Sequence, residues 1–171
     1  MFLAAYDSNG NNLWALPGGG VEDDIGRGLG HDAAGNILVV GDYADIGHFP
    51  PQTVTSNGYA DLFAASYSAD GSTLNWIKSA GGHDSDRGRG IGSDSDGNTY
   101  ICGEFIDSIQ MGNTNMMGNL YLDIYVSKIG INNICTAQLA ISSQNSCAGQ
   151  CDGTAVATVT GQSPFNYAWS T

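Results

Sequence analysis

Glycines spaced in the manner of a phosphate-binding loop occur twice in this chain, in the runs Gly26-Arg-Gly28-Leu-Gly30 and Gly88-Arg-Gly90-Ile-Gly92. A dinucleotide-binding loop has the pattern G-x-G-x-x-G, and a helix follows it. Here the third glycine comes one residue too early, and no helical pattern follows. We therefore interpret these glycines as positions where strands come close together.

Two acidic clusters lie just before arginines: Glu22-Asp23-Asp24 precedes Arg27, and Asp84-Ser-Asp86 precedes Arg89. Such clusters can form an acidic rim that binds cations or a basic partner. The alternative, which we favour, is an Asp–Arg pair within each structural unit that holds a loop in place.

A further acidic motif, Asp94-Ser-Asp96-Gly97-Asn98, resembles part of a calcium-binding loop. Calcium loops of that type place glycine at position 6 and glutamate at position 12. Here the glycine stands at position 4, and Phe105 stands at position 12. The motif therefore predicts a hairpin turn, with weak calcium binding as the alternative.

The remaining reactive residue types lack partners in the sequence. The run Gly149-Gln-Cys151-Asp-Gly153 has the spacing of a nucleophile elbow, but it lacks the strand-turn-helix context and a partner histidine. His31, His48 and His83 recur at no common spacing, so we expect ordinary surface or loop positions for them. We assign no catalytic residue, no cofactor-binding residue and no metal ligand.

Aromatic residues recur at matched positions, Trp14 with Trp76 and Tyr6 with Tyr67. They could stack on sugars, but a recurring aromatic residue in a strand more often packs in a core. Cys102 lies in an apolar run, and we expect it to be a buried, small hydrophobic residue that stays reduced.

Composition excludes several functional classes. The chain has 171 residues, and 17 acidic against 5 basic side chains give a net charge of −12. Nucleic acids and anionic membrane surfaces are bound by clustered basic residues, so neither is an expected partner. No apolar run approaches the roughly 18–20 residues of a membrane span, so we expect no membrane insertion. The 25 glycines indicate many tight turns.

An internal repeat organises these motifs. The segment 2–10 returns at 63–71, the Asp24–Gly30 run returns at 86–92, and Asp32-Ala-Ala-Gly-Asn36 returns as Asp94-Ser-Asp-Gly-Asn98, a spacing of about 62 residues. A third copy begins at Asp123. Within each copy, short apolar runs alternate with turn residues, and no segment has a helical stripe.

The repeat predicts an all-β fold. We expect strands over 3–6, 13–16, 28–31 and 37–40, followed by a long connector at 42–61. The same pattern is expected over 62–102, followed by a connector at 104–123. Four-stranded antiparallel units that repeat radially are β-propeller blades. Residues 1–130 are therefore expected to form two blades, about 1–61 and 62–123, plus the first strand of a third at 124.

The repeated pattern F-x-A-x-Y-D-x-x-G-N-x-x-W-A, with the later G-G, D-x-G-x-G-I and D-x-x-G-N runs, resembles the SBBP-type β-propeller repeats of secreted bacterial proteins, common in Bacteroidetes. The resemblance covers about residues 1–130. It implies an extracellular or cell-surface propeller and supplies no catalytic residues. A closed propeller has four to eight blades, so the chain is expected to hold part of one.

After a linker at 131–137, residues 138–171 change character. The C-x-x-x-C-x-G turn at Cys147–Gly153, the alternating strand 154–160 and the run Pro164-Phe-x-Tyr-x-Trp169 resemble the start of a SprB-type repeat, an immunoglobulin-like module of Bacteroidetes surface adhesins. Such a sandwich needs about 100 residues, so this module is expected to be truncated. The compartment that these resemblances imply is oxidising, and on that basis we predict a Cys147–Cys151 disulfide across a short flexible loop.

These observations favour a secreted or surface-anchored, non-enzymatic binding or adhesion scaffold, whose partner is an extracellular protein or glycan. The alternatives are a propeller hydrolase or lyase with its catalytic residues in other blades, and a purely structural spacer. The chain start, Met1–Asp7, lacks a basic signal region. Read literally this means a cytosolic protein, but the repeats favour an internal piece of a longer chain. We expect such a piece to self-associate through uncovered blade faces.

Overall fold

The computed structural model describes residues 1–129, 140–143 and 155–158 of the chain. The chain divides into two compact units, Met1–Gly130 and Ile131–Thr171. The predicted linker at 131–137 and the predicted Cys147–Cys151 disulfide lie outside the described residues, as do Cys135 and the Gly149–Gly153 run. In the second unit, only the antiparallel strands β12 (Ala140–Ser143) and β13 (Ala155–Thr158) are described.

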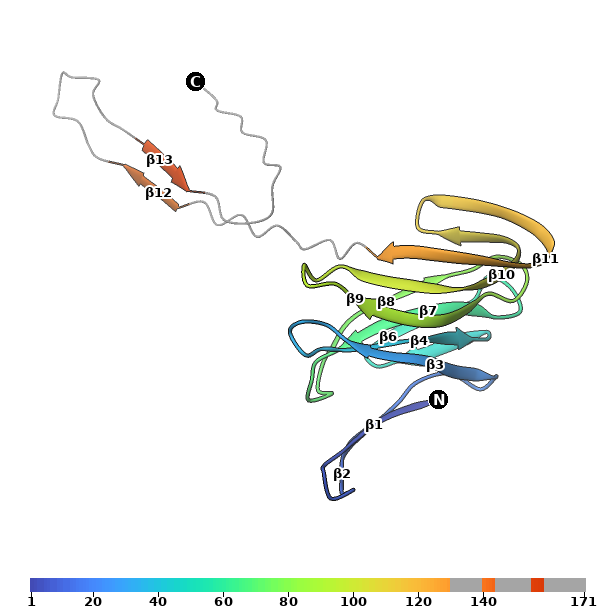
Figure 1. Ribbon diagram of the computed structural model, residues 1–171, viewed down its shortest axis with the longest axis horizontal. Helices are drawn as coiled ribbons and strands as arrows, with labels where there is room; N and C mark the ends of the chain where they lie inside the picture. The colour runs from blue at the N-terminus through green and yellow to red at the C-terminus, as the bar shows by residue number, and fades with distance from the viewer. Residues whose placement is uncertain (130–139, 144–154, 159–171) are drawn as a thin grey trace. The chain divides into compact units, whose positions relative to one another are not determined.

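The first unit consists of strands joined by turns, and every described element of the chain is a strand, which confirms the all-β prediction (Figure 1). Its strands are β1 (Phe2–Tyr6), β2 (Asn12–Pro17), β3 (Asp24–His31), β4 (Ile37–Tyr43), β5 (Ile46–Phe49), β6 (Gln52–Thr55), β7 (Asp61–Tyr67), β8 (Leu74–Ala80), β9 (Arg87–Ser93), β10 (Thr99–Met111) and β11 (Thr114–Ile129). All of the strand pairs are antiparallel.

The central sheet has four strands in the order β3-β4-β7-β8. We expected the four strands of residues 1–61 to form one sheet, and this prediction is wrong. The β1–β2 hairpin forms its own sheet, while β4 pairs along its whole length with β7, from Ile37↔Tyr67 to Tyr43↔Asp61. The segment between β4 and β7 folds back on itself, which brings β7 alongside β4. Each sheet therefore crosses the boundary between two sequence repeats.

The second sheet, β11-β10-β9, repeats the pairing of the first. Gly41 faces Phe63 in the first sheet, and Gly103 faces Tyr125 in the second. The predicted third copy is therefore present as the C-terminal half of β11, paired with β10. In this sheet no described strand stands in the place that β8 occupies beside β7.

The predicted connectors, 42–61 and 104–123, contain hairpins. In the first copy β5 and β6 form a separate hairpin. In the second copy β10 and β11 run on past a register shift between Ile106 and Ser108 to pair again from Ser108 to Met111. Both copies turn at an aspartate with a left-handed backbone, Asp45 (φ 58°) and Asp107 (φ 63°). The same backbone bend thus starts each hairpin.

Two apolar clusters hold the sheets together, and they are the same interface repeated. In one, Val39, Tyr43 and Phe63 pack with Leu3 and Leu16 of the β1–β2 hairpin. In the other, the equivalent residues Ile101, Phe105 and Tyr125 of the second sheet pack against Leu62 and Ala64 of β7.

Strands β3 and β9 lie side by side, and their glycines allow this close approach (Figure 1). A Cβ atom on Gly28 would lie 3.2 Å from the carbonyl oxygen of Arg89 and 2.8 Å from a methyl group of Val40. A Cβ atom on Gly30 would lie 3.1 Å from the carbonyl oxygen of Ile91. The interpretation of the Gly-Arg-Gly runs as points of strand crowding is therefore confirmed.

Candidate functional site

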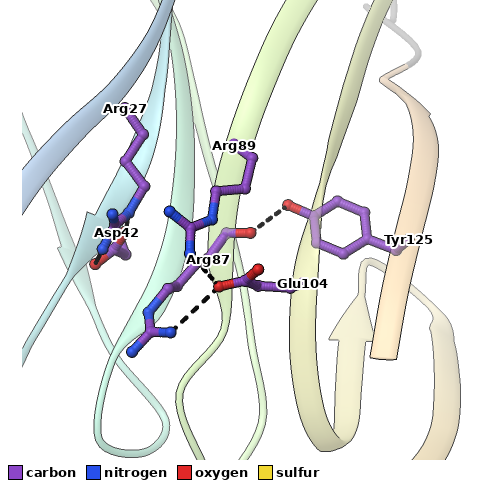
Figure 2. Close-up of polar contacts among 6 residues, drawn as sticks. All are labelled: Arg27, Asp42, Arg87, Arg89, Glu104 and Tyr125. Carbon is purple, nitrogen blue, oxygen red and sulfur yellow. Dashed lines mark hydrogen bonds and ion pairs between the residues drawn. The ribbon is translucent and has the colours of Figure 1, made fainter. Parts of the chain in front are cut away.

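A row of ion pairs runs across the neighbouring strands β3, β4, β9 and β10 (Figure 2). Arg27 donates from Nε and Nη2 to the two carboxylate oxygens of Asp42, which is buried. In the next repeat, Glu104 accepts from both Arg87 and Arg89. Asp42 and Glu104 occupy equivalent positions, as do Arg27 and Arg89, so the pairing recurs with the sequence repeat.

These contacts stabilise the charged forms of the paired groups. The hydrogen bond to Asp42 raises the pKa of Arg27 above its ordinary value. The hydrogen bond from Arg89, together with that from Arg87, lowers the pKa of Glu104. The hydroxyl of Tyr125 donates to the carbonyl of Arg87 at 3.2 Å and ties β11 to this row. The ion pairs therefore link β3 to β4 within the central sheet and β9 to β10 within the second sheet.

Pairs between an acidic residue and an arginine are present in each repeat, as predicted, but the acidic residues are not the predicted ones. Asp24 and Asp86 do not pair with Arg27 and Arg89. Their carboxylates accept the backbone N–H of Gly20 and Gly82 instead. The cross-strand register explains the difference, because β3 and β9 each lie beside a strand that carries an acid, Asp42 on β4 and Glu104 on β10. The recurrence of an acidic residue at equivalent positions, Asp42 and Glu104, was a sequence signal that could have identified these two partners of the arginines.

Three aspartates at the strand ends have a buried carboxylate oxygen without a hydrogen-bond partner: Asp24, Asp61 and Asp86. Asp61 and Asp86 are fully buried, and adjacent residues Ala60 and Ser85 form a parallel bridge. Burial, and then the nearby charge of Asp61, raise the pKa of Asp86 to about 7. Burial also raises the pKa of Asp61. Sequence reasoning missed Asp61, although it recurs as Asp123.

The motif at Asp94 forms a hairpin turn, as predicted. Its carboxylate accepts the backbone N–H groups of Asp96 and Asn98, and the side chains of Asn98 and Tyr100. These hydrogen bonds lower the pKa of Asp94 to about 2. The same turn occurs at Asp32 and Asp7, with asparagine four residues later in each case. The carboxylate thus closes its own turn.

The other predicted positions separate into exposed and packed groups. His31, His48 and His83 are exposed. Trp76 packs beside the second cluster, and Trp14 lies against Gly71 of the β7–β8 turn. Tyr67 is buried, whereas its counterpart Tyr6 is exposed.

Cys102 is a free, exposed thiol, so the prediction that it is buried is wrong. It occupies the position of Val40, which the second sheet covers. No described element covers the matching face of β10.

Across residues 1–129, 140–143 and 155–158, no three Asp, Glu, His or Cys side chains converge as metal ligands. The same residues include no helix long and apolar enough to cross a membrane. Comparison with models of known protein families found no match, and comparison with curated proteins found none either.

Proposed function

We propose that this chain is part of a β-propeller that serves as a non-enzymatic binding or adhesion scaffold outside the cell or on its surface. The proposal depends most on one observation: the interface between successive sheets occurs twice, with equivalent residues on each side. A unit that packs in the same way on each neighbour can be added repeatedly to form an array. When four-stranded sheets are arranged radially in such an array, they form a propeller.

The outer face of the second sheet supports this proposal. Leu62 and Ala64 of β7 are 1% and 0% exposed, because the second sheet covers them. Their equivalents on β11, Ile124 and Val126, are 84% and 77% exposed. Because this face is covered by a sheet in one repeat and exposed in the next, a further sheet could pack on it in the same way.

The opposite end of the array has the complementary face. Phe63 and Tyr67 are buried where the β1–β2 hairpin packs on the central sheet. Their equivalents in the hairpin, Phe2 and Tyr6, are 75% and 60% exposed. The two open faces therefore correspond to the two sides of one internal interface, and a head-to-tail contact could join them.

The extracellular role rests on the resemblance of residues 1–130 to SBBP-type repeats and of 138–171 to SprB-type adhesin modules. In this proposal the propeller presents a binding surface, the C-terminal module extends it, and the partner is an extracellular protein or glycan. The net charge of −12 is consistent with a partner other than nucleic acid.

An array experiment tests the binding role. The fluorescently labelled full chain would be applied to glycan and extracellular-protein arrays. Saturable binding to a defined ligand, with no chemical change in that ligand, is the expected result. The absence of any saturable ligand would indicate a structural spacer, and conversion of a bound ligand to product would indicate an enzyme. Either result would overturn the proposal.

A further inference from the structure

The same groove between successive sheets is present in both repeats, but its lining differs. In the first repeat it has a volume of about 180 Å³ and is bordered by Leu16, Pro17, Pro50 and Tyr67. In the second it has a volume of about 300 Å³. There the positions 62 residues later are Lys78, Ser79, Gly112 and Ile129, and all four border the groove. The two grooves therefore share these four positions, which carry different side chains, while Gly71, Ser72 and Leu74 also border the first groove.

Smaller side chains line the wider groove at three of the shared positions. Two prolines are replaced by serine and glycine, and Tyr67 is replaced by Ile129. Behind the first groove, the buried ring of Phe49 packs on Phe63, with ring centroids 4.7 Å apart. Its equivalent in the second repeat is Met111, which lines the wider groove. A thioether chain fills irregular space less rigidly than a phenyl ring.

The wider groove also gains a charge, because Lys78 stands where the first groove has Leu16. Lys78 lies opposite Ala64 in the sheet and alternates along β8 with Trp76 and Ala80, which pack against the cluster between the sheets. Side chains two residues apart on a strand share a face. Lys78 therefore lies on the groove side of the sheet, and none of the residues that border the groove is acidic.

Lys78 is also the basic side chain that has no charged or aromatic partner among the described residues. The three arginines pair with Asp42 or Glu104. Lys128 borders the groove too, but its ammonium lies 5.7 Å from the ring centroid of Tyr100. Tyr100 is its cross-strand neighbour and adjoins the exposed Cys102. One unpaired ammonium therefore adjoins an apolar groove in a chain with a net charge of −12.

We propose that this groove binds a small organic anion with an apolar body, and that Lys78 pairs with its carboxylate. Leu62, Ala64, Ile101 and Ile129 supply the apolar lining. The volume lies at the lower end of the range for small-molecule sites, roughly 300–1,000 Å³. Of the two ammonium groups that border the groove, only that of Lys78 has no partner among the described residues, which suits a monoanion, and the net negative charge of the chain disfavours a polyanion. This site is separate from the protein or glycan contact of the proposed scaffold and does not depend on it.

Calorimetric titration of the full chain with decanoate, at neutral pH and low salt, tests the proposal. Saturable 1:1 binding of decanoate is expected, with weaker binding of decanol and none of decyltrimethylammonium. Lys78→Leu installs the residue of the first groove and should weaken decanoate binding about tenfold, since a hydrogen bond to a charged group is lost. Lys128→Leu removes the same charge from the second lysine that borders the groove, whose ammonium lies over the Tyr100 ring, and should weaken binding less than Lys78→Leu does.

A second variant tests the space rather than the charge. Met111→Phe with Ile129→Tyr restores the bulk found in the first groove and should abolish decanoate binding, with folding checked by circular dichroism. If that variant does not fold, the comparison of the two lysine variants decides alone. The proposal is overturned if decanoate shows no saturable binding, if the folded double variant binds as well as the parent, or if the two lysine variants weaken binding equally.

Discussion

At the scale of single residues, the ion pairs of the two sheets are centred on two recurring acidic residues. Asp42 and Glu104 stand at equivalent positions, but their surroundings differ: Asp42 has one arginine partner, and Glu104 has two. A buried carboxylate with a single arginine partner is left without an ion pair when that arginine is removed. This difference between equivalent positions leads to a test.

We predict that Arg27→Ala destabilises the chain more than Arg89→Ala does. Removal of Arg27 leaves the buried Asp42 carboxylate unpaired, at a cost of about 2 kcal/mol. Removal of Arg89 leaves Glu104 paired with Arg87, and Arg89 is itself partly exposed, so a loss below about 1 kcal/mol is expected. Urea unfolding of both variants measures this. Equal losses would show that Arg87 does not compensate.

A second residue-scale prediction concerns pH. The pKa of Asp86 is raised to about 7 in the folded chain, above its ordinary value of 3.8. Between these values the folded state binds more protons at this residue than the unfolded state does, so stability contributed here is present below pH 4 and is lost as the pH rises towards 7. The loss approaches about 1.4 kcal/mol per pH unit for one proton.

The difference between the parent and Asp86→Asn isolates this contribution, because asparagine does not titrate. Urea unfolding from pH 4 to pH 8 should show that the variant gains stability relative to the parent as the pH rises, and that the gain levels off above pH 7. A constant difference between the two profiles would show that Asp86 does not carry the raised pKa.

At the scale of the strands, the sequence predicted the strands outside the connectors, but neither the hairpins within 42–61 and 104–123 nor how the strands combine into sheets. Apolar runs bounded by Asp-x-x-Gly-Asn turns marked the strands, because both signals are local. The grouping of strands into sheets was wrong, since a repeat of about 62 residues has no marked starting point. Only the pairing of β4 with β7 shows that a sheet begins at β3.

The predictions of a buried Cys102 and of the acidic partners of the arginines were wrong for a related reason. The burial of Cys102 depends on whether another sheet covers its face, and local sequence does not report that. The partner of Arg27 depends on the register between β3 and β4, which places Asp42 within reach. By contrast, the Asp94 turn depends on hydrogen bonds within one short run, and its interpretation was correct. The glycine runs were also interpreted correctly, because glycine indicates close approach of backbones even where the two strands are far apart in the chain.

The contact between β3 and β9 gives an element-scale prediction. Gly28→Ala should destabilise the chain by about 1–3 kcal/mol, because the added methyl group would press on Val40 and on the Arg89 carbonyl. Gly92→Ala serves as the control, because a Cβ atom there would meet nothing within 4 Å, and its effect should stay within about 0.5 kcal/mol. Thermal melts compare the two. Equal effects would mean that β3 and β9 are not in close contact.

At the scale of the whole molecule, two apolar faces lie open at the ends of the first unit, and the net charge is −12. Apolar contact favours association of these faces, while charge repulsion opposes it. Salt screens that repulsion within about 10 Å at 0.1 M. We therefore predict that self-association of the chain increases with salt, as measured by sedimentation velocity. A monomer that persists from low to high salt would contradict this.

The central claim is that the two open faces are the two sides of one repeated interface, and mixing of single-face variants tests it most directly. Ile124→Glu with Val126→Glu blocks one face, and Phe2→Glu with Tyr6→Glu blocks the other. In sedimentation velocity at high salt, each variant alone should remain a monomer. An equimolar mixture should form a 1:1 dimer, because each variant retains the face that the other lacks. If the mixture stays monomeric, or if one variant still self-associates as the parent does, the faces are not complementary and the propeller account is contradicted.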